Sequence, residues 1–199
     1  KYYKSIAGAD FAILDSGLLV LILKLVKLKK IRKYSGYLFL KEFLADESVR
    51  FKNSIFLINP SHESSKINHI FLREKGFNLT VKDHYVAPFY DKSEITDYEL
   101  LKKLDILKPK FILINLGGGV QERLGFFLKN NLTFNPGIIC TGAALSFFTG
   151  QQAKIPMFVD KFYLGWLARC LHNPAGFIPR YLSAFKLVGL LLRNFKSIK

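Results

Sequence analysis

The stretch Phe111–Gly150, FILINLGGGVQERLGFFLKNNLTFNPGIICTGAALSFFTG, decides the fold of this chain. It opens with the apolar run Phe111–Ile114, which is too short for a helix and predicts a strand buried on both faces of a parallel sheet. Three glycines follow, and Gln121–Asn130 then has the pattern of a helix. A glycine turn between a strand and a helix brings backbone N–H groups and the positive helix end together, which is the geometry of an anion-binding site.

A second strand with a glycine turn follows directly. Residues Gly137–Thr141 predict a strand that runs into Gly142, small residues and then Gly150. We expect the two strands to be neighbours, so that both turns lie at the carboxyl edge of one sheet, where open α/β folds bind their ligands. Many α/β proteins bind nothing at such turns, and the alternative is that these glycines serve only the chain reversal.

Strand and helix patterns alternate through the rest of the chain, with no internal repeat and no low-complexity linker. Short strands are predicted at residues 11–14, 54–58 and 79–83. Helices are predicted at residues 18–28, 36–45, 63–74 and from Thr96 or Asp97 to Lys108, and residues 1–9 have the pattern of a helix end. This alternation predicts a single α/β layer sandwich with a Rossmann-like, mainly parallel sheet flanked by helices.

The chain becomes basic and apolar together after Pro156. From Gln151 to the end there are eight Lys or Arg residues and one acid, in a chain whose formal charge is +15. Residues 158–171 predict one helix, Asn173-Pro174 predicts a break, and residues 178–195 predict a second helix. Such helices either pack on the sheet or lie in the headgroup layer of an anionic membrane. We therefore expect a core at 1–156 and a basic amphipathic helical appendage that docks on a membrane at 157–199.

Composition narrows the classes of function. The positive charge implies an anionic partner, and nucleic acid is disfavoured because its binders more often interleave arginine with exposed aromatic and polar residues. The apolar run 18–28 contains two lysines and is too short to span a bilayer. The cysteines, Cys140 in a predicted core strand and Cys170, favour a reduced cytoplasmic protein. His62 and His69 lack the spacing of a helical zinc pair, so we expect no metal site.

Five segments taken in order resemble the WecG/TagA/CpsF family of bacterial glycosyltransferases, glycosyltransferase family 26. They are GGGVQE at 117–122, TGAALSFFTG at 141–150, KIP at 154–156, LGWLARCLHNP at 164–174 and PRY at 179–181. The matching family patterns are G-x-P-K-Q-E, G-x-x-F-D-x-x-x-G, R-A-P, L-E-W-x-x-R-L and P-x-R with a following R-Y. Upstream, AGADFAILDSG at 7–17 resembles the family's A-D-x-x-x-x-D-G with one additional serine. Family members usually carry a further strand and helix before this point, so we expect a truncated amino terminus.

The resemblance implies an inverting, metal-independent transfer of a sugar from a UDP-sugar to a sugar carried on polyprenyl diphosphate. It places the protein peripherally on the inner face of the cell membrane, without a cofactor, and a homo-oligomer is a further expectation. Asp15 is implied as the general base, and two appendage arginines are implied to reach diphosphate groups. The predicted substrate-binding residues are Gly117, Gly118, Gly119, Gln121, Glu122, Thr141, Gly142, Ser146, Arg169 and Arg180.

The sequence departs from the family pattern at four positions. Val120 replaces a lysine, Ser146 an aspartate, Lys154 an arginine and Gly165 a glutamate. The first hypothesis is a glycosyltransferase with an altered donor or acceptor, for example a hexose in place of N-acetylmannosamine. The second is a catalytically inactive relative that serves as a membrane-associated subunit of a polysaccharide assembly complex. The third is a nucleotide-binding oxidoreductase, which is disfavoured because no G-x-G-x-x-G with a downstream acid is present.

Overall fold

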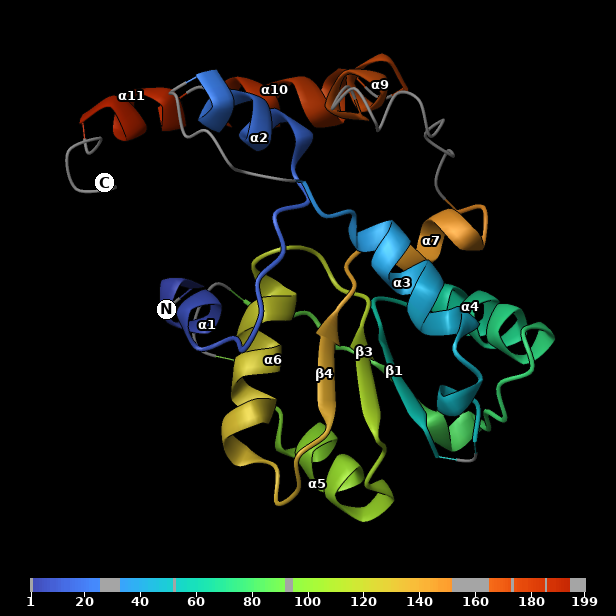
Figure 1. Ribbon diagram of the computed structural model, residues 1–199. Helices are drawn as coiled ribbons and strands as arrows, with labels where there is room; N and C mark the ends of the chain where they lie inside the picture. The colour runs from blue at the N-terminus through green and yellow to red at the C-terminus, as the bar shows by residue number, and fades with distance from the viewer. Residues whose placement is uncertain are drawn as a thin grey trace. The chain divides into compact units, whose positions relative to one another are not determined.

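The computed structural model describes residues 2–25, 33–51, 53–91, 95–151, 165–172, 174–184 and 186–193 (Figure 1). Contacts divide the chain into two compact units. The first comprises residues 1–12 and 36–153, and the second comprises residues 13–35 and 154–199. The second unit therefore combines a segment from the amino-terminal part of the chain with the carboxyl-terminal segment.

The first unit is built on a parallel sheet. Among the described residues it has four strands in the order β2-β1-β3-β4. The strands are β1 (Ile55–Asn59), β2 (His84–Val86), β3 (Phe111–Ile114) and β4 (Gly137–Cys140). Because β3 pairs directly with β4, the expectation that the two glycine-turn strands are neighbours is confirmed. The predicted Rossmann-like α/β fold is confirmed with it.

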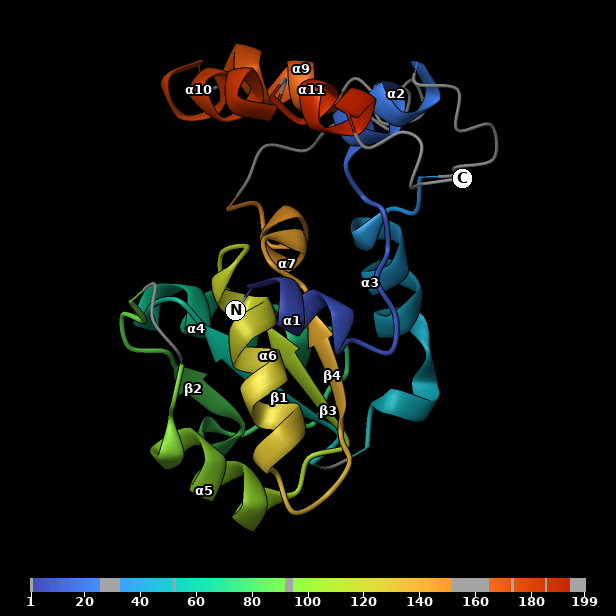
Figure 2. The same ribbon diagram turned by 90° about the vertical axis from the view of Figure 1, so that its left-hand side faces the viewer.

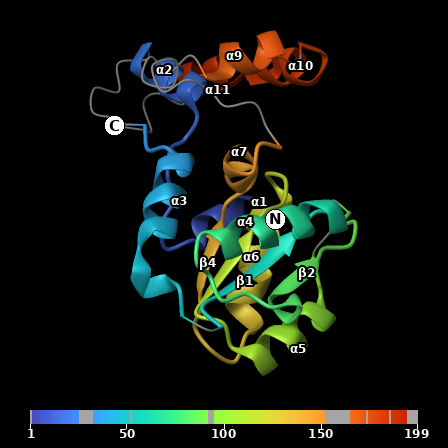
Figure 3. The same cartoon turned by 90° about the vertical axis from the view of Figure 1, so that its right-hand side faces the viewer.

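Helices cover both faces of this sheet (Figures 1 and 2). One face carries α5 (Tyr98–Leu107) and α6 (Val120–Asn131), and α1 (Tyr2–Ala7) packs on α6. The other face carries α3 (Gly36–Ala45), α4 (His62–Glu74) and α7 (Ala144–Phe148), as Figure 3 shows from the opposite side. Each strand therefore has helices on both sides, which is why the central strands are continuous apolar runs.

The core has two layers because successive strand residues point to opposite faces of the sheet. Phe56 and Ile112 pack with α5 and α6, whereas Leu57 and Leu113 pack with α3 and α4. All four side chains are fully buried. The predicted strand at 111–114 and the predicted helix at 36–45 are found with those bounds.

Capping residues fix the helix starts that the sequence indicated. Asp97 accepts a hydrogen bond from the backbone N–H of Leu100 at 2.9 Å and begins α5, and Ser61 does the same for α4 through Ser64 at 3.1 Å. At the other end of α5, Lys108 adopts a left-handed conformation with φ 46°. The helix therefore stops before the β3 strand begins.

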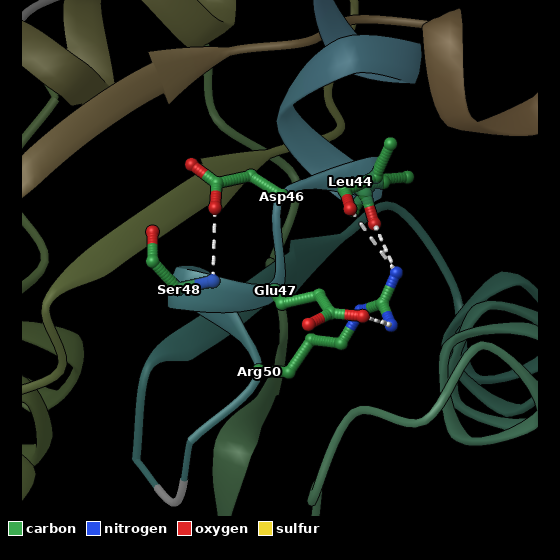
Figure 4. Close-up of polar contacts among 6 residues, drawn as sticks. Leu44, Asp46, Glu47, Ser48 and Arg50 are labelled. Atoms are coloured by element: carbon green, nitrogen blue, oxygen red, sulfur yellow. Dashed lines mark hydrogen bonds and ion pairs between the residues drawn. The ribbon is translucent and has the colours of Figure 1, made fainter.

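The connection from α3 to β1 is held by a small polar cluster (Figure 4). The Asp46 carboxylate accepts from the Ser48 N–H at 2.8 Å and caps the short 3-10 helix η1 (Glu47–Val49). Arg50 donates to the carbonyl oxygen of Ala45 at 3.2 Å and lies 3.9 Å from the Glu47 carboxylate. The last turn of α3 is thereby tied to the chain that enters the sheet.

Two predicted strands are wrong. Residues 11–14 form no strand, and Phe11 and Ile13 are exposed, because this segment leads out of the first unit into the second and pairs with no strand. Residues 79–83 contain the 3-10 helix η2 (Val81–Asp83) instead, because Thr80 and Asp83 form a reciprocal capping box that fixes a turn there. The strand β2 begins only at His84.

The described part of the second unit is helical. It contains α2 (Gly17–Leu25), α9 (Gly165–His172), α10 (Pro174–Ala184) and α11 (Lys186–Arg193). α2 buries Leu18, Val20 and Ile22 and packs against α9, which packs against α10. Trp166 of α9 meets Tyr181 of α10 edge-on, with ring centroids 5.8 Å apart. None of the helices that the structure describes combines the length and the apolar character required to cross a membrane.

The helices of this unit differ from the predicted ones in their bounds. α10 begins at Pro174, where a break was predicted, because proline fits the first position of a helix, where its missing N–H is not needed. The predicted second helix falls on α10 and α11, which lie on either side of position 185, a position outside the described residues. Residues 26–28, 158–164, 185 and 194–195 of the predicted helices lie outside the described residues, as do Asn173 of the predicted break and Lys154.

Candidate functional site

The glycine turn after β3 leaves open space at the carboxyl edge of the sheet. Gly119 has φ 88°, a left-handed conformation that favours glycine, and α6 begins at the next residue. Gly117 and Gly118 are exposed, and a Cβ atom added to either would meet nothing within 4 Å. Only at position 119 does the backbone conformation therefore require glycine. The other two glycines leave room for a ligand to approach the main chain.

Gln121 and Glu122 connect this turn to the turn after β4. The backbone N–H of Gly119 donates to Glu122 Oε2 at 2.5 Å, and Gln121 Nε2 donates to Glu122 Oε1 at 3.0 Å. Gln121 Oε1 in turn accepts from the N–H of Gly142 at 2.7 Å, and Gly142 has φ 55°. An internal carboxylate thus caps the positive end of α6, and the two predicted glycine turns are joined by side chains.

Arg123 is a further residue of this rim, and the sequence reasoning did not single it out. Its Nε donates to the Gly119 carbonyl at 2.8 Å, and its terminal nitrogens donate to the Asp91 carbonyl at 3.2 Å. The loop that follows β2 is therefore held beside the glycine turn. A cation in the first turn of a helix interacts unfavourably with the helix dipole. An arginine at this position of the predicted helix was therefore a sequence signal for a specific interaction of Arg123.

A row of polar side chains lies directly beneath the rim. The Thr141 hydroxyl lies 2.7 Å from Asn115 Oδ1 and 2.9 Å from the Ile114 carbonyl. Asn115 Nδ2 donates to Asn59 Oδ1 at 3.1 Å, and Asn68 Nδ2 of α4 donates to the same oxygen at 2.7 Å. Of these four residues only Thr141 was predicted as a site residue, because the contacts become visible only when the strand register is known.

The remaining predicted site residues lie elsewhere. Ser146 is a half-buried residue of α7, which follows the Gly142 turn. Asp15 is exposed and belongs to the second unit, just before α2, where the Ser16 hydroxyl accepts the N–H of Leu19 at 3.3 Å. Arg169 in α9 and Arg180 in α10 belong to that unit too. The structure therefore gathers Gly117–Gly119, Gln121, Glu122, Thr141 and Gly142 at one rim, and Asp15 with the two arginines in one unit.

Comparisons with known proteins show the family to which this chain belongs. The sequence profile described as "Glycosyl transferase WecG/TagA/CpsF family" matches residues 1–199. The chain belongs to this family. The N-acetylglucosaminyldiphosphoundecaprenol N-acetyl-beta-D-mannosaminyltransferase of Bacillus spizizenii is 26% identical over 92% of this chain and 71% of its own length. A protein of the same name from Staphylococcus aureus is 20% identical over 59% of this chain and 44% of its own length.

Membership in the WecG/TagA/CpsF family gives the departures from its pattern a structural setting. Val120, in place of the family lysine, is the first residue of α6 and follows the glycine turn directly. Gly165, in place of the family glutamate, is a residue of α9. Position 120 is thus a helix start, where a side-chain charge would act on the end of a helix.

Cys140 lies beside the rim, and the surroundings of its sulfur disfavour the thiolate form. β4 is an edge strand of the described sheet and Cys140 is exposed as a residue, so the predicted core position is wrong. Its sulfur nevertheless lies against α6, 3.5 Å from the Gln121 carbonyl oxygen. Burial of the sulfur, with the nearby Glu122 charge, raises the pKa of the thiol to about 12. Cys140 and Cys170 are both free thiols.

Two other features of the first unit contain none of the predicted site residues. His69 Nδ1 and His84 Nε2 are 2.7 Å apart beneath α4, and burial together with the His69 charge lowers the pKa of His84 to about 4. A shallow, mainly apolar groove of about 300 Å³ runs between α4 and α7. It is lined by Ile67, Ile70, Phe71, Glu74, Phe148 and Thr149.

Proposed function

We propose that this chain is an inverting glycosyltransferase that moves a sugar from a UDP-sugar onto a sugar carried on polyprenyl diphosphate, in the synthesis of a cell-surface polysaccharide. The observation that carries the proposal is the family match over residues 1–199. The names of both relatives support the lipid-linked acceptor, since each name contains N-acetylglucosaminyldiphosphoundecaprenol. The donor sugar is N-acetylmannosamine or another hexose, because Ser146 and Gly165 replace family residues.

The first unit is proposed to bind the donor diphosphate. Gly117 and Gly118 are exposed and have no Cβ atoms, so phosphate oxygens can reach their backbone. Gln121 and Glu122 already bond to the turn and to Gly142, and their proposed role is to hold the shape of the rim as well as to meet the donor. Preformed donors of this kind stabilise charge that develops on a leaving diphosphate.

The second unit is proposed to supply the base and further positive charge. Asp15 would accept the proton of the acceptor hydroxyl as the new glycosidic bond forms and the bond from the sugar to UDP breaks. Arg169 and Arg180 would pair with diphosphate oxygens through their guanidinium forks. The chemistry so proposed needs no metal and no cofactor.

The second unit also presents an apolar surface suited to a membrane. Leu167 and Leu171 of α9, and Ile178 and Leu182 of α10, are spaced four residues apart on their helices and are exposed. Leu171 is 77% exposed and Leu182 63%. An exposed apolar row on a basic segment is typical of helices that lie in the headgroup layer, so we place the protein peripherally on the inner face of the cell membrane.

The alternative function is that of an inactive relative in a membrane-associated polysaccharide assembly complex. It is favoured by the four departures from the family pattern, of which Ser146 removes a carboxylate. Under this alternative the rim binds a UDP-sugar without turning it over, or binds none.

A UDP-release assay separates the two. The protein is incubated with membranes that contain polyprenyl-diphosphate-linked N-acetylglucosamine and with a panel of UDP-sugars. We expect release with at least one donor, and a fall of roughly 10²–10⁴-fold in Asp15→Ala, the usual contribution of a general base. Asp46→Ala is the matched control, because Asp46 is an exposed carboxylate that caps η1 in the first unit (Figure 4).

Three results of this assay decide the assignment. Undiminished release by Asp15→Ala would dismiss Asp15 as the base. Equal losses in Asp15→Ala and Asp46→Ala would show that the loss reflects folding and not proton transfer. No release with any donor would favour the inactive relative.

A further inference from the structure

The polar row beneath the rim lies at the carboxyl ends of three neighbouring strands. In the pairing of β1 with β3 and of β3 with β4, the last paired residues are Ile58, Ile114 and Cys140, which lie opposite one another. On its other side β1 pairs with β2 for one residue more, through Asn59 and Val86. The residues that follow them are Asn59, Asn115 and Thr141. Their side chains are bonded in the order Thr141 to Asn115 to Asn59. Side chains therefore connect the three strands at the point where the chain leaves each strand for its turn.

Each member of the row comes immediately before a turn of the rim. Asn59 precedes Pro60, Asn115 precedes Leu116 and the glycine turn, and Thr141 precedes Gly142. The backbone also holds this row, since the N–H of Asn115 donates to the Ile58 carbonyl and the N–H of Thr141 to the Ile114 carbonyl. The spacing of the three turns is consequently set by the spacing of these three residues.

The row lies on the α4 face of the sheet. Asn115 is two residues after Leu113 and therefore shares its face of the sheet, and Leu113 packs in the α3 and α4 layer. Asn68 of α4 joins the row at Asn59. On the α6 face the two glycine turns are joined by Gln121, which accepts from Gly142. The carboxyl ends of β3 and β4 are thus connected by side chains on both faces.

Stability alone does not explain amides at these positions. Asn59 is fully buried, Asn68 is 2% exposed and Asn115 is 7% exposed. Within the described part of the chain, Asn59 Nδ2 and Asn68 Oδ1 have no hydrogen-bond partner. Apolar side chains of the same shape are often as stable as a buried polar cluster, and they leave no polar group unpaired. Because two polar atoms of this cluster have no hydrogen-bond partner, the row is better explained by the geometry that it imposes on the turns of the rim.

We propose that the row Asn59–Asn115–Thr141 is a positioning device for the donor, which fixes the three rim turns in the spacing that a UDP-sugar requires. This inference rests on the proposed function, because it assumes that a UDP-sugar binds at the rim. Asn59 and Asn115 are buried and act only through the turns. Thr141 is half-buried and closes the row toward Gly142.

The test removes both side-chain bonds of Asn115, to Thr141 and to Asn59, without removing volume. Asn115→Leu keeps the size of the side chain, and Thr141→Val removes only the hydroxyl. Thr133→Val is the matched control, because the Thr133 hydroxyl lies 2.8 Å from the Asp105 carboxylate and Thr133 is exposed before β4 begins. UDP and UDP-sugar affinities are measured by calorimetry on the intact protein, together with the melting temperature and the amide hydrogen exchange of Gly119, Thr141 and Gly142.

We expect Asn115→Leu to raise the dissociation constant of UDP by roughly fivefold or more, because it removes two buried hydrogen bonds and one such bond is worth about that factor. The exchange of the Thr141 and Gly142 amides should become faster in the absence of ligand, while the melting temperature stays close to that of the wild type. The double variant with Thr141→Val should lose less affinity than the two single losses added together, because both changes remove the bond between Thr141 and Asn115. Thr133→Val should leave affinity and exchange unchanged.

Two results would overturn the inference. One is an Asn115→Leu protein with wild-type affinity and wild-type exchange at the rim. The other is additive losses of affinity in the double variant, which would mean that Thr141 and Asn115 act separately. A wild-type protein that binds no UDP-sugar would defeat the proposed function itself. The positioning role would then be decided by exchange alone, with acceleration supporting it and no change overturning it.

Discussion

The two units of this chain differ in how their proposed functional surfaces are built. The sheet unit buries Phe56, Leu57, Ile112 and Leu113 completely and connects the polar groups of its rim to one another. The helical unit leaves an apolar row of α9 and α10 at its surface. The difference teaches that the first unit is organised before any partner arrives, whereas the second carries a surface that suits an apolar partner.

The largest effect that we expect from this contrast is on stability. Phe56→Ala should lower the free energy of unfolding by about 3–5 kcal/mol, the usual effect of removing a buried aromatic ring. Phe89→Ala is the matched control, because Phe89 is 96% exposed, and it should change that free energy by less than about 0.5 kcal/mol. Urea unfolding monitored by circular dichroism checks both values. Similar losses in the two variants would show that exposure does not separate the two classes of aromatic residue.

A second effect concerns the pH dependence of the first unit. His84 titrates near 6.5 when unfolded, and its pKa of about 4 in the folded chain means that the unfolded state binds more protons between these values. Stability should therefore fall as the pH is lowered from about 6.5 toward 4, by up to about 3 kcal/mol from this one group. His84→Gln should reduce this loss of stability, measured as the difference between the free energies of urea unfolding at pH 7 and at pH 4.5. His62→Gln is the control, because His62 is an exposed histidine of α4, and it should leave the loss unchanged.

A third effect tests the exposed row of the second unit. Leu171→Asp combined with Leu182→Asp should weaken binding to vesicles that contain anionic lipid by roughly 100-fold, because two leucines no longer enter the apolar layer. Ile106→Asp provides the control, since Ile106 is 71% exposed on α5 of the first unit. Sedimentation with vesicles measures the binding. If Ile106→Asp weakened binding as much, the membrane surface would not be specific to α9 and α10.

The smallest effect separates the two uses of glycine at the rim. Gly119→Ala should cost about 1 kcal/mol of stability, because its φ of 88° is unfavourable for alanine. Gly117→Ala meets open space and should leave stability unchanged, but its methyl group should weaken UDP binding. Thermal unfolding and calorimetry distinguish these results. Unchanged UDP affinity in Gly117→Ala would favour the alternative that these glycines serve only the turn.

The sequence predicted those elements whose signals are local. The apolar run Phe111–Ile114 between a proline and three glycines could only be a buried strand, and Asp97 marked the start of α5 through its side-chain bond. The false strands failed for two physical reasons. Residues 11–14 have a strand-like composition but no neighbour to pair with, and a capping box outweighed the strand pattern of residues 79–83.

The candidate site was predictable in its turns and not in its bonds. Glycine spacing identified both rim turns, since each follows a short apolar run that forms a strand, and β3 pairs with β4. That Gln121 would bond to Gly142, or Asn115 to Asn59, depends on which strands are adjacent and in what register. These contacts span 21 and 56 residues of sequence, which no local pattern can indicate. The roles assigned to Asp15, Arg169 and Arg180 stay predictions.

The second unit is assembled from two distant pieces of sequence, and this affects how the protein can be taken apart. α2, from the amino-terminal piece, rests on α9 from the carboxyl-terminal piece, and its Val20 is fully buried. A shortened protein that stops at residue 153 would therefore keep α2 but lose the helix that covers it. Such a truncation exposes an apolar surface of α2. Aggregation or altered behaviour of the shortened protein would therefore not report cleanly on the function of the deleted segment.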